Sequence, residues 1–391
     1  MSMQEVQQAF READPGLYSK ETDRADITPD RVGPAIEGYF HLPAIWIGEE
    51  PNPETVKKLN PAVHHQVVYA ADLEQGIRIR VQRDGTFLFD FANWPLAPIT
   101  LIPGYTVADP KSSWRATKEH QAAENLAEDR AALRAQLMNV HQACLATAQF
   151  RLKRSSSPLG LPVRPSGSHK AITLDTPLSY YHYADDPRAL ARNFINNSYN
   201  LEHDNKSHRR IIDISVVARS IEILESIVDF QDEKVIHICD TAYIFAQRQM
   251  DRRYGESVVA GWTACEQLIS IAWTKHLESL PSTRPDTVRV NRDRMKKLKG
   301  RDYSASVMVE ALEIAGVISG ATYDHLEFAR KARNAWAHAV KTPSETDLYH
   351  CRRGLENLMS QVLGVDWHVH GGAGGGVPQW PVWMWEVYKG R

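Results

Sequence analysis

The chain has few of the features that mark secreted, membrane-spanning or zinc-stabilised proteins. Its four cysteines are far apart and form no C-x-x-C pair, so the sequence predicts neither a disulfide framework nor a zinc knuckle. No apolar run approaches the roughly 18 residues that a membrane span requires, and the first residues are polar and acidic, unlike a signal peptide. We therefore expect a cytoplasmic protein with reduced thiols, no cofactor and no metal site.

A strong excess of one charge is missing as well. The 46 Lys and Arg residues are balanced by 48 Asp and Glu residues, which gives a formal net charge of −2. This balance disfavours a protein that coats nucleic acid with its whole surface, so any contact with RNA must be local. P-loop, G-x-S-x-G, H-E-x-x-H and dinucleotide-binding motifs are also absent from the sequence, which leaves the familiar NTPase, hydrolase, zincin and Rossmann chemistries without support.

The first part of the chain shows the alternating pattern of β-strands. With 391 residues, 43% of them hydrophobic, the chain is long enough for two domains. Apolar residues at 77, 79 and 81, a turn at 83–85 and phenylalanines at 87, 89 and 91 predict a β-hairpin. Further strands are expected near 38–47, 65–70 and 99–107, and one long helix over 114–153. Residues 1–153 are thus predicted to be a small, mostly antiparallel β domain with a long helix, acting as a sensor or regulator.

The second part of the chain is predicted to be all-helical. A stretch rich in Ser, Pro and Gly makes residues 154–206 a linker and connecting segment. Helices are expected over 208–230, 232–280 with a break near 254–255, 304–315, 322–340 and 344–363. Their short connections favour an antiparallel bundle over 207–364, so the fold class is α+β. The Gly- and Trp-rich tail, 365–391, is expected to form a hairpin against the β domain or a second subunit.

One helix of this bundle carries chemistry. About 100° per residue places four polar side chains on one face of the helix over 322–340: Arg330, Arg333, Asn334 and His338. The opposite face is expected to pack in the core as a stripe of mostly small residues: Phe328, Ala332, Ala335 and Ala339.

At these residues the chain resembles the HEPN superfamily, whose signature places a histidine five positions after an arginine, late in an all-helical bundle. Arg333, Asn334 and His338 match that signature, and the resemblance covers about residues 207–364. Glu266, between two tryptophans on an earlier helix, suits the same family pattern. Many HEPN members are metal-independent endoribonucleases in toxin–antitoxin, abortive-infection and CRISPR-associated defence systems. Others are catalytically inactive or bind nucleotides.

The resemblance implies catalytic roles for the motif. His338 would act as acid or base, because imidazole exchanges protons near neutral pH. Arg333 would stabilise charge on the phosphate, and Asn334 would orient the imidazole or bind a phosphate oxygen. HEPN ribonucleases generally pair two motifs in one cleft, so one motif per chain implies a homodimer, or a higher oligomer. Alternatively, the same side chains pair with carboxylates and merely close a subunit surface.

Supporting roles are expected for several charged residues. Arg330 either extends the motif face or is a solvated charge. Glu266 either orients Arg333 or His338, or forms a salt bridge at the edge of the core. A basic run between 289 and 301 could hold RNA phosphates or be an ordinary basic loop: Arg292, Arg294, Lys296, Lys297 and Lys299. The phenylalanines at 87, 89 and 91 could stack bases, but burial in the core is the stronger interpretation.

The leading hypothesis is a dimeric, metal-independent endoribonuclease, a prokaryotic antiphage, abortive-infection or toxin effector that cleaves RNA. Its β domain would bind a regulatory ligand or protein partner, since such an active site must be restrained. The alternatives are a catalytically silent or nucleotide-binding HEPN module and a structural adaptor in a larger complex.

Overall fold

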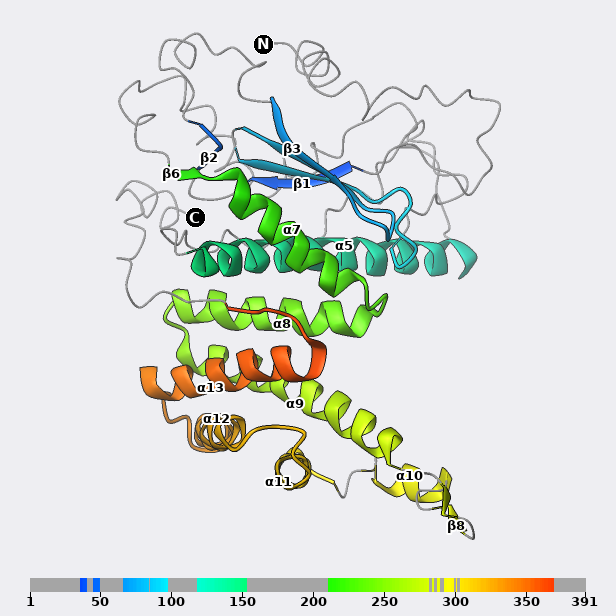
Figure 1. Ribbon diagram of the computed structural model, residues 1–391, viewed down its shortest axis with the longest axis vertical. Coiled ribbons are helices and arrows are strands. Elements are labelled where there is room, and N and C mark those ends of the chain that lie inside the picture. The colour runs from blue at the N-terminus through cyan, green and yellow to red at the C-terminus, as the bar shows by residue number, and fades with distance from the viewer. Residues whose placement is uncertain are drawn as a thin grey trace. The chain divides into compact units, whose positions relative to one another are not determined.

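The protein has a mixed α+β fold, with an antiparallel sheet in the N-terminal part and helices in the C-terminal part, as predicted (Figure 1). The computed structural model describes residues 36–40, 45–49, 66–83, 85–97, 118–152, 210–280, 283–284, 287–288, 292–298, 300 and 303–368. Two compact units form: Met1–Ser156 with Gly160–Ile236, and Ser157–Leu159 with His237–Arg391. Among the described residues, no helix has the length and apolar character needed to cross a membrane.

The first unit contains a four-stranded sheet in the order β1-β5-β4-β3. The strands are β1 (Ile36–Phe40), β3 (Val67–Asp72), β4 (Arg78–Gln82) and β5 (Thr86–Asp90), and all neighbours are antiparallel. The predicted hairpin is confirmed, with Ile79 opposite Phe89 and Val81 opposite Phe87. Gly85 makes its turn possible because it adopts a φ of 85°, which favours glycine. The strand expected near 99–107 lies outside the described residues.

One face of this sheet packs on α5 (Lys118–Arg151). Phe87, Phe89 and Phe91 are fully buried, so the prediction that they belong to the core is confirmed. His141 of α5 is buried among them, with its ring 5.0 Å from Phe87 and 5.4 Å from Phe89. Its Nδ1 is hydrogen-bonded to the Tyr39 hydroxyl at 2.7 Å. The other ring nitrogen, Nε2, lies 3.3 Å from the hydroxyl of Ser220. Both polar atoms of the buried imidazole therefore have a partner.

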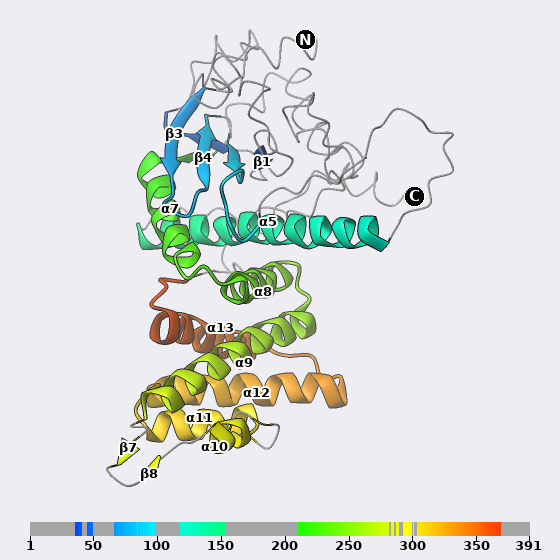
Figure 2. The same ribbon diagram turned by 90° about the vertical axis from the view of Figure 1, so that its right-hand side faces the viewer.

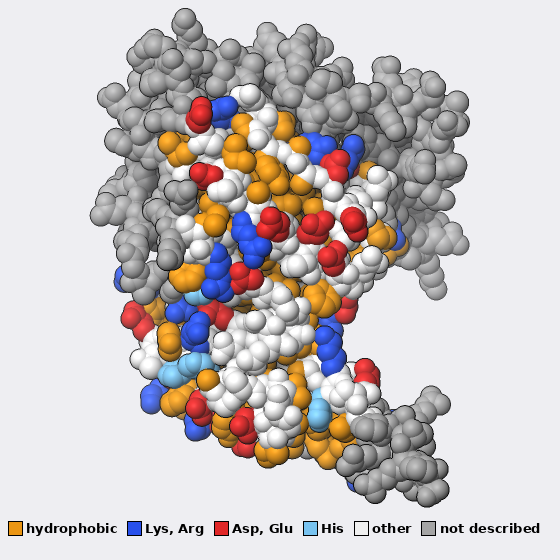
Figure 3. All heavy atoms as spheres, in the orientation of Figure 1, with side chains coloured by type: hydrophobic (Ala, Val, Ile, Leu, Met, Phe, Trp, Pro, Cys, Tyr) orange, Lys and Arg blue, Asp and Glu red, His pale blue; other side chains and the backbone are white. Residues whose placement is uncertain are grey.

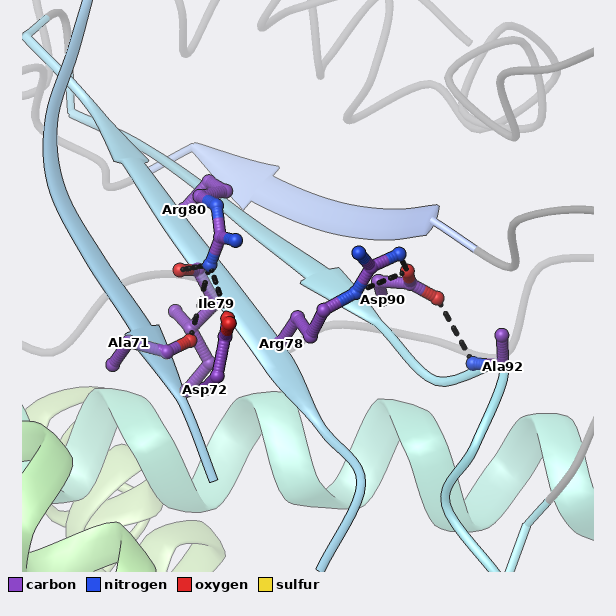
Figure 4. A network of polar contacts seen from close by, with 7 residues as sticks. All are labelled: Ala71, Asp72, Arg78, Ile79, Arg80, Asp90 and Ala92. Carbon is purple, nitrogen blue, oxygen red and sulfur yellow. Dashed lines mark hydrogen bonds and ion pairs between the residues drawn. The ribbon is translucent and has the colours of Figure 1, made fainter. Parts of the chain in front are cut away.

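The other face of the sheet is polar (Figure 4). Arg78 of β4 pairs with Asp90 of β5, and the same carboxylate accepts a hydrogen bond from the Ala92 backbone at 2.9 Å. Arg80 donates to Asp72 of β3 at 2.7 Å. These ion pairs join neighbouring strands, so they stabilise the register of the sheet and neutralise the charges of the paired side chains.

The segment from residue 208 was predicted to be helical, and that prediction is wrong at its start. Strand β6 (Arg210–Ile212) pairs in parallel with β2 (Ile45–Ile47). Helix α7 (Ile214–Val228) follows, with Asp213 as its N-cap, and packs on α5 (Figures 1 and 2). Residues up to Ile236 therefore group with the first unit, whereas the sequence placed everything from 207 in the bundle. A strand that pairs with residues 45–47 is set by a distant contact that helical periodicity does not report.

Helices make up most of the described part of the second unit (Figure 2). They are α8 (Glu233–Met250), α9 (Tyr254–Ser279), α10 (Arg292–Leu298), α11 (Ala305–Ile314), α12 (Gly320–Ala339) and α13 (Glu345–Leu358). The first residues of α8 group with the first unit, and α13 continues as a short π-helix over Met359–Leu363. A short hairpin, β7 (Thr283–Arg284) with β8 (Thr287–Val288), precedes α10. The predicted order of helices and the break before α9 are confirmed, and α13 begins with a capping box of Ser344 with Asp347.

Helices α9, α12 and α13 pack on one another, and α11 packs on α9 and α12. The contact between α9 and α13 needs glycine at Gly261 of α9, because a Cβ there would lie 2.6 Å from the sulfur of Cys351 on α13. The hairpin predicted for the tail falls on residues 369–391, outside the described part of the chain, which ends at His368.

Candidate functional site

The motif lies in the last two turns of α12. The helix begins after Ser319, whose hydroxyl accepts a hydrogen bond from the Thr322 backbone at 3.2 Å. It ends at Val340, which adopts a left-handed conformation with a φ of 51°. Arg333, Asn334 and His338 therefore sit on regular helix close to a chain reversal, a place where side chains reach solvent.

The buried face of α12 differs from the predicted one. Thr322, Leu326, Ala329 and Ala332 are buried, whereas Phe328 is 50% exposed and Ala339 is exposed. The expectation of a core stripe is thus wrong for Phe328 and Ala339, although Ala332 is buried as predicted and Ala335 is intermediate. The cause lies on α13, where a Cβ on Gly354 would be 3.0 Å from Leu326. A glycine on the partner helix makes room for a leucine, so the buried face of α12 includes Leu326 as well as Ala329 and Ala332.

Trp336, inside the motif, fixes this end of α12 against the start of α9. A Cβ on Gly255 would lie 2.3 to 2.5 Å from three atoms of the indole ring, so the ring rests directly on the glycine backbone. The sequence marked Gly255 as the break between two helices but gave no sign that it faces Trp336. This contact sets the position of the residues on either side of the tryptophan.

Arg333 has an unusual environment for a half-buried guanidinium. Its Nη1 donates to the side-chain oxygen of Asn334 at 3.0 Å, and among the described residues it makes no ion pair with a carboxylate. Neighbouring Arg330 is different, because it donates two hydrogen bonds of 2.8 Å to Glu327. That pairing raises the pKa of Arg330 and lowers the pKa of Glu327. The structure therefore gives Arg330 a local partner and leaves Arg333 beside a neutral amide.

His338 is exposed in the last turn of α12. Within the described part of the chain, no side-chain hydrogen bond or ion pair joins it to Arg333 or Asn334. About 140° separates Arg333 from His338 on an ideal helix, so one copy of the chain presents guanidinium and imidazole in different directions. The sequence placed them on one face, and they occupy the two edges of that face.

The supporting residues are not gathered at the motif. Glu266 is half-buried on α9, between the buried Trp262 and Trp273, and within the described chain it forms no ion pair with Arg333 or His338. In the basic run, Lys296 and Lys297 are exposed at the end of α10. The side chains of Arg292 and Arg294, and the whole of Lys299, lie outside the described residues.

A cluster of four rings, which the sequence did not reveal, lies where α12 meets α13. His325 and Phe328 come from α12, and Tyr349 and His350 from α13. The Nδ1 atoms of the two histidines are 2.8 Å apart. Phe328 stacks on His350 with centroids 4.3 Å apart and an interplanar angle of 19°. We call these four residues the ring cluster; its sequence signal, two adjacent aromatics after the Ser344 cap, is too common to have been decisive.

Charged groups surround the ring cluster. Burial, followed by the nearby His350 and the charge of Arg353, lowers the pKa of His325. Farther along α13, buried Glu356 accepts a hydrogen bond from Arg353 at 2.7 Å and lies 2.9 Å from Nδ1 of His368. Burial alone would raise the pKa of Glu356, but His368 and the two arginines Arg352 and Arg353 hold it below its ordinary value.

His368 thus has a carboxylate partner. Among the residues that the structure describes, no three His, Cys, Asp or Glu side chains are grouped as metal ligands. Comparisons of this chain with family models, curated proteins and solved structures found no match. The chemistry of the site must therefore be inferred from its own residues.

Proposed function

We propose that the chain is a metal-independent endoribonuclease of the HEPN type, a prokaryotic antiphage, abortive-infection or toxin effector that works in the cytoplasm. The observation that supports this most directly is the environment of Arg333. Its guanidinium is half-buried, bonded to the neutral amide of Asn334 and, among the described residues, without a carboxylate partner. A planar cation held in place but not neutralised is suited to bind the oxygens of a phosphate group.

The proposed reaction is an internal transesterification. The ribose 2′-oxygen attacks phosphorus, and the bond from phosphorus to the 5′-oxygen breaks, so the products are a 2′,3′-cyclic phosphate and a 5′-hydroxyl. One group must remove the 2′ proton and another must protonate the leaving oxygen. His338, exposed to solvent, is assigned to proton transfer. Arg333 stabilises the charge that grows on the phosphate, and Asn334 keeps the guanidinium in position.

The proposal includes a homodimer, with a higher oligomer as a variant. Two proton-transfer steps call for two groups, and one chain supplies one motif histidine. His338 and Arg333 also make no contact with each other in the described part of a single chain. A second copy that brings its own α12 to the same phosphate would supply the missing group.

The alternative is a catalytically silent or nucleotide-binding module, or a structural adaptor. The separation of His338 from Arg333 favours it, as does the absence of an ion pair between the motif and Glu266 among the described residues. In either case we assign regulation by a ligand or protein partner to the N-terminal unit.

RNA cleavage in the presence of EDTA tests the proposal. Purified full-length protein should cut single-stranded or structured RNA with chelator present, and Arg333→Ala and His338→Ala should each lower the rate by at least about a hundredfold. His237→Ala, a matched change of an exposed histidine on α8, should have no effect. Product ends identified by mass spectrometry should be cyclic phosphates.

Four results would contradict this function. They are cleavage that requires added metal, cleavage that survives in His338→Ala, products that carry a 5′-phosphate, and no cleavage by the wild-type protein. The first would point to a different mechanism and the second to a contaminating nuclease.

A further inference from the structure

Two exposed aromatic side chains of the ring cluster, one on each of two neighbouring helices, contact the same histidine ring. Phe328 of α12 is 50% exposed and Tyr349 of α13 is 45% exposed. His350 holds both, because Phe328 stacks on its ring at 4.3 Å and Tyr349 meets it edge-on at 5.5 Å. Single exposed hydrophobic residues are ordinary on protein surfaces. Two rings fixed by a third make an ordered aromatic surface whose side chains lose little freedom on binding.

The core does not need these rings. The buried side of α12 is formed by Leu326, Ala329 and their neighbours, and Phe328 lies away from it. In Figure 3, hydrophobic, histidine and basic side chains lie together over α13. The cluster is thus a surface feature built from two helices that pack closely on each other.

Positive charge accompanies the exposed rings. The guanidinium of Arg352 lies 5.6 Å from the centre of the Tyr349 ring, and the Arg353 and Lys331 side chains are 40% and 70% exposed. Glu327 pairs with Arg330 and Lys331, and Glu356 pairs with Arg352 and Arg353, so these two carboxylates are shared by four cations and positive charge is in excess. Exposed Asp324 opposes the effect at one end. Aromatic rings bordered by Lys and Arg form the surface on which single-stranded nucleic acids bind.

Phe328 shares a helix face with His338. On an ideal helix Phe328, Lys331 and His338 fall within an arc of about 80°, and the ten residue steps from Phe328 to His338 span about 15 Å. A strand lying along this side of α12 would pass from the rings over Lys331 to the imidazole.

We propose that Phe328 and Tyr349, supported by His350, form a platform on which a base of single-stranded RNA stacks, with Lys331 and Arg353 on the flanking phosphates. The platform binds the substrate strand at a fixed distance from the motif. Its link to cleavage rests on the proposed function, whereas base stacking itself does not. Duplex RNA is excluded because its bases are already stacked inside the helix.

Fluorescence anisotropy with full-length protein tests the platform. The probe is a short labelled single strand with 2′-O-methyl groups, which prevent cleavage, and the comparison is the same sequence as a duplex. Phe328→Ala and Tyr349→Ala should each weaken single-strand binding about tenfold, since that is typical of one lost base–aromatic contact. Phe328→Trp should bind like wild type. Phe150→Ala, which removes an exposed phenylalanine from α5, serves as the matched control and should change nothing.

Phe328→Leu guards against a folding defect, because it keeps apolar volume but removes the ring. It should lose affinity while its melting curve matches wild type. The platform is overturned if wild type does not bind the single strand, or if the alanine variants bind it as wild type does. It is also overturned if sedimentation shows that Phe328→Ala dissociates an oligomer at unchanged RNA affinity, because the rings would then be a protein contact.

The two proposals fail separately. Cleavage that depends on His338 but is indifferent to Phe328 removes the platform and keeps the nuclease. Strand binding that depends on Phe328, in a protein that never cleaves RNA, keeps the platform and removes the nuclease.

Discussion

Gly255 is the residue that most tightly limits the position of the motif. The indole of Trp336 occupies the space where any side chain at 255 would begin. Protein interiors are close-packed and relax only partly, so a change at this glycine must be transmitted to α12. Because Trp336 lies between Asn334 and His338 in the same two turns, the effect should reach both.

Gly255→Ala should therefore destabilise the protein by about 1–3 kcal/mol, the usual cost of overpacking, as measured by urea unfolding. Gly320→Ala is the control, because a Cβ there meets nothing closer than 3.7 Å. Its stability should stay equal or rise slightly, since alanine favours helix. Equal midpoints for Gly255→Ala and wild type would show that Trp336 does not rest on the glycine.

At the scale of residues, local features could be predicted from the sequence better than contacts between helices. The place of the motif residues on a helix and the burial of Phe87 could be derived because each depends on local pattern. The contact of Trp336 with Gly255 and the pairing of His325 with His350 could not, because each joins residues from two helices whose packing has no local signal.

Helix α12 shows that the bounds of an element can be predicted correctly while its buried face is predicted wrongly. Its bounds were found within two residues, since the Ser319 cap and the helical pattern define them. Its buried face was misplaced because the pattern of apolar residues alone does not show which side of the helix meets α13. Gly354 of α13 leaves room for Leu326, which lies about 160° from Phe328 on an ideal helix, so the burial of Leu326 leaves Phe328 on the exposed side.

The junction of α12 with α13 should be sensitive to acid. His325 faces His350, Arg353 and Glu356 from α13 and Asp324 from its own helix, and its pKa is lowered, first by burial. The unfolded chain therefore takes up a proton at a higher pH than the folded protein, so stability is lost as the pH falls below about 6.5. Glu356, with its lowered pKa, adds a further loss only below about 4.5.

Thermal melts at pH 7.5 and 5.5 check this, and wild type should melt at a lower temperature at pH 5.5. His325→Gln should reduce the difference, whereas His237→Gln on α8 should leave it unchanged. If wild type melts at the same temperature at both values, the histidine pair contributes nothing to the junction.

At the scale of the whole molecule, the α+β class and the order of elements could be read from the sequence because hydrophobic periodicity changes from two to that of a helix along the chain. The boundary between the units was displaced, because α7 has an amphipathic pattern that suits a bundle equally well. Only its packing on α5 and the pairing of β6 with β2 show where it belongs.

A composite active site makes a prediction about mixed subunits. Wild-type and His338→Ala chains that are unfolded together and refolded as a mixture should show less activity than the wild-type fraction alone accounts for. A mixed dimer would hold one motif histidine for two proton transfers and would therefore be inactive. Nuclease assays on mixtures of varied ratio measure this, and activity in direct proportion to the wild-type fraction would contradict a shared site.

The pairing of β2 with β6 also has a consequence for biosynthesis. Residues 45–47 must wait for residues 210–212 before their edge of the first unit is complete, and such distant pairings form slowly. Yet α7 and the rest of that unit are synthesised by residue 236, well before the ribosome reaches Arg333. During translation, the part we assign to restraint is thus synthesised before the part that would need restraining exists.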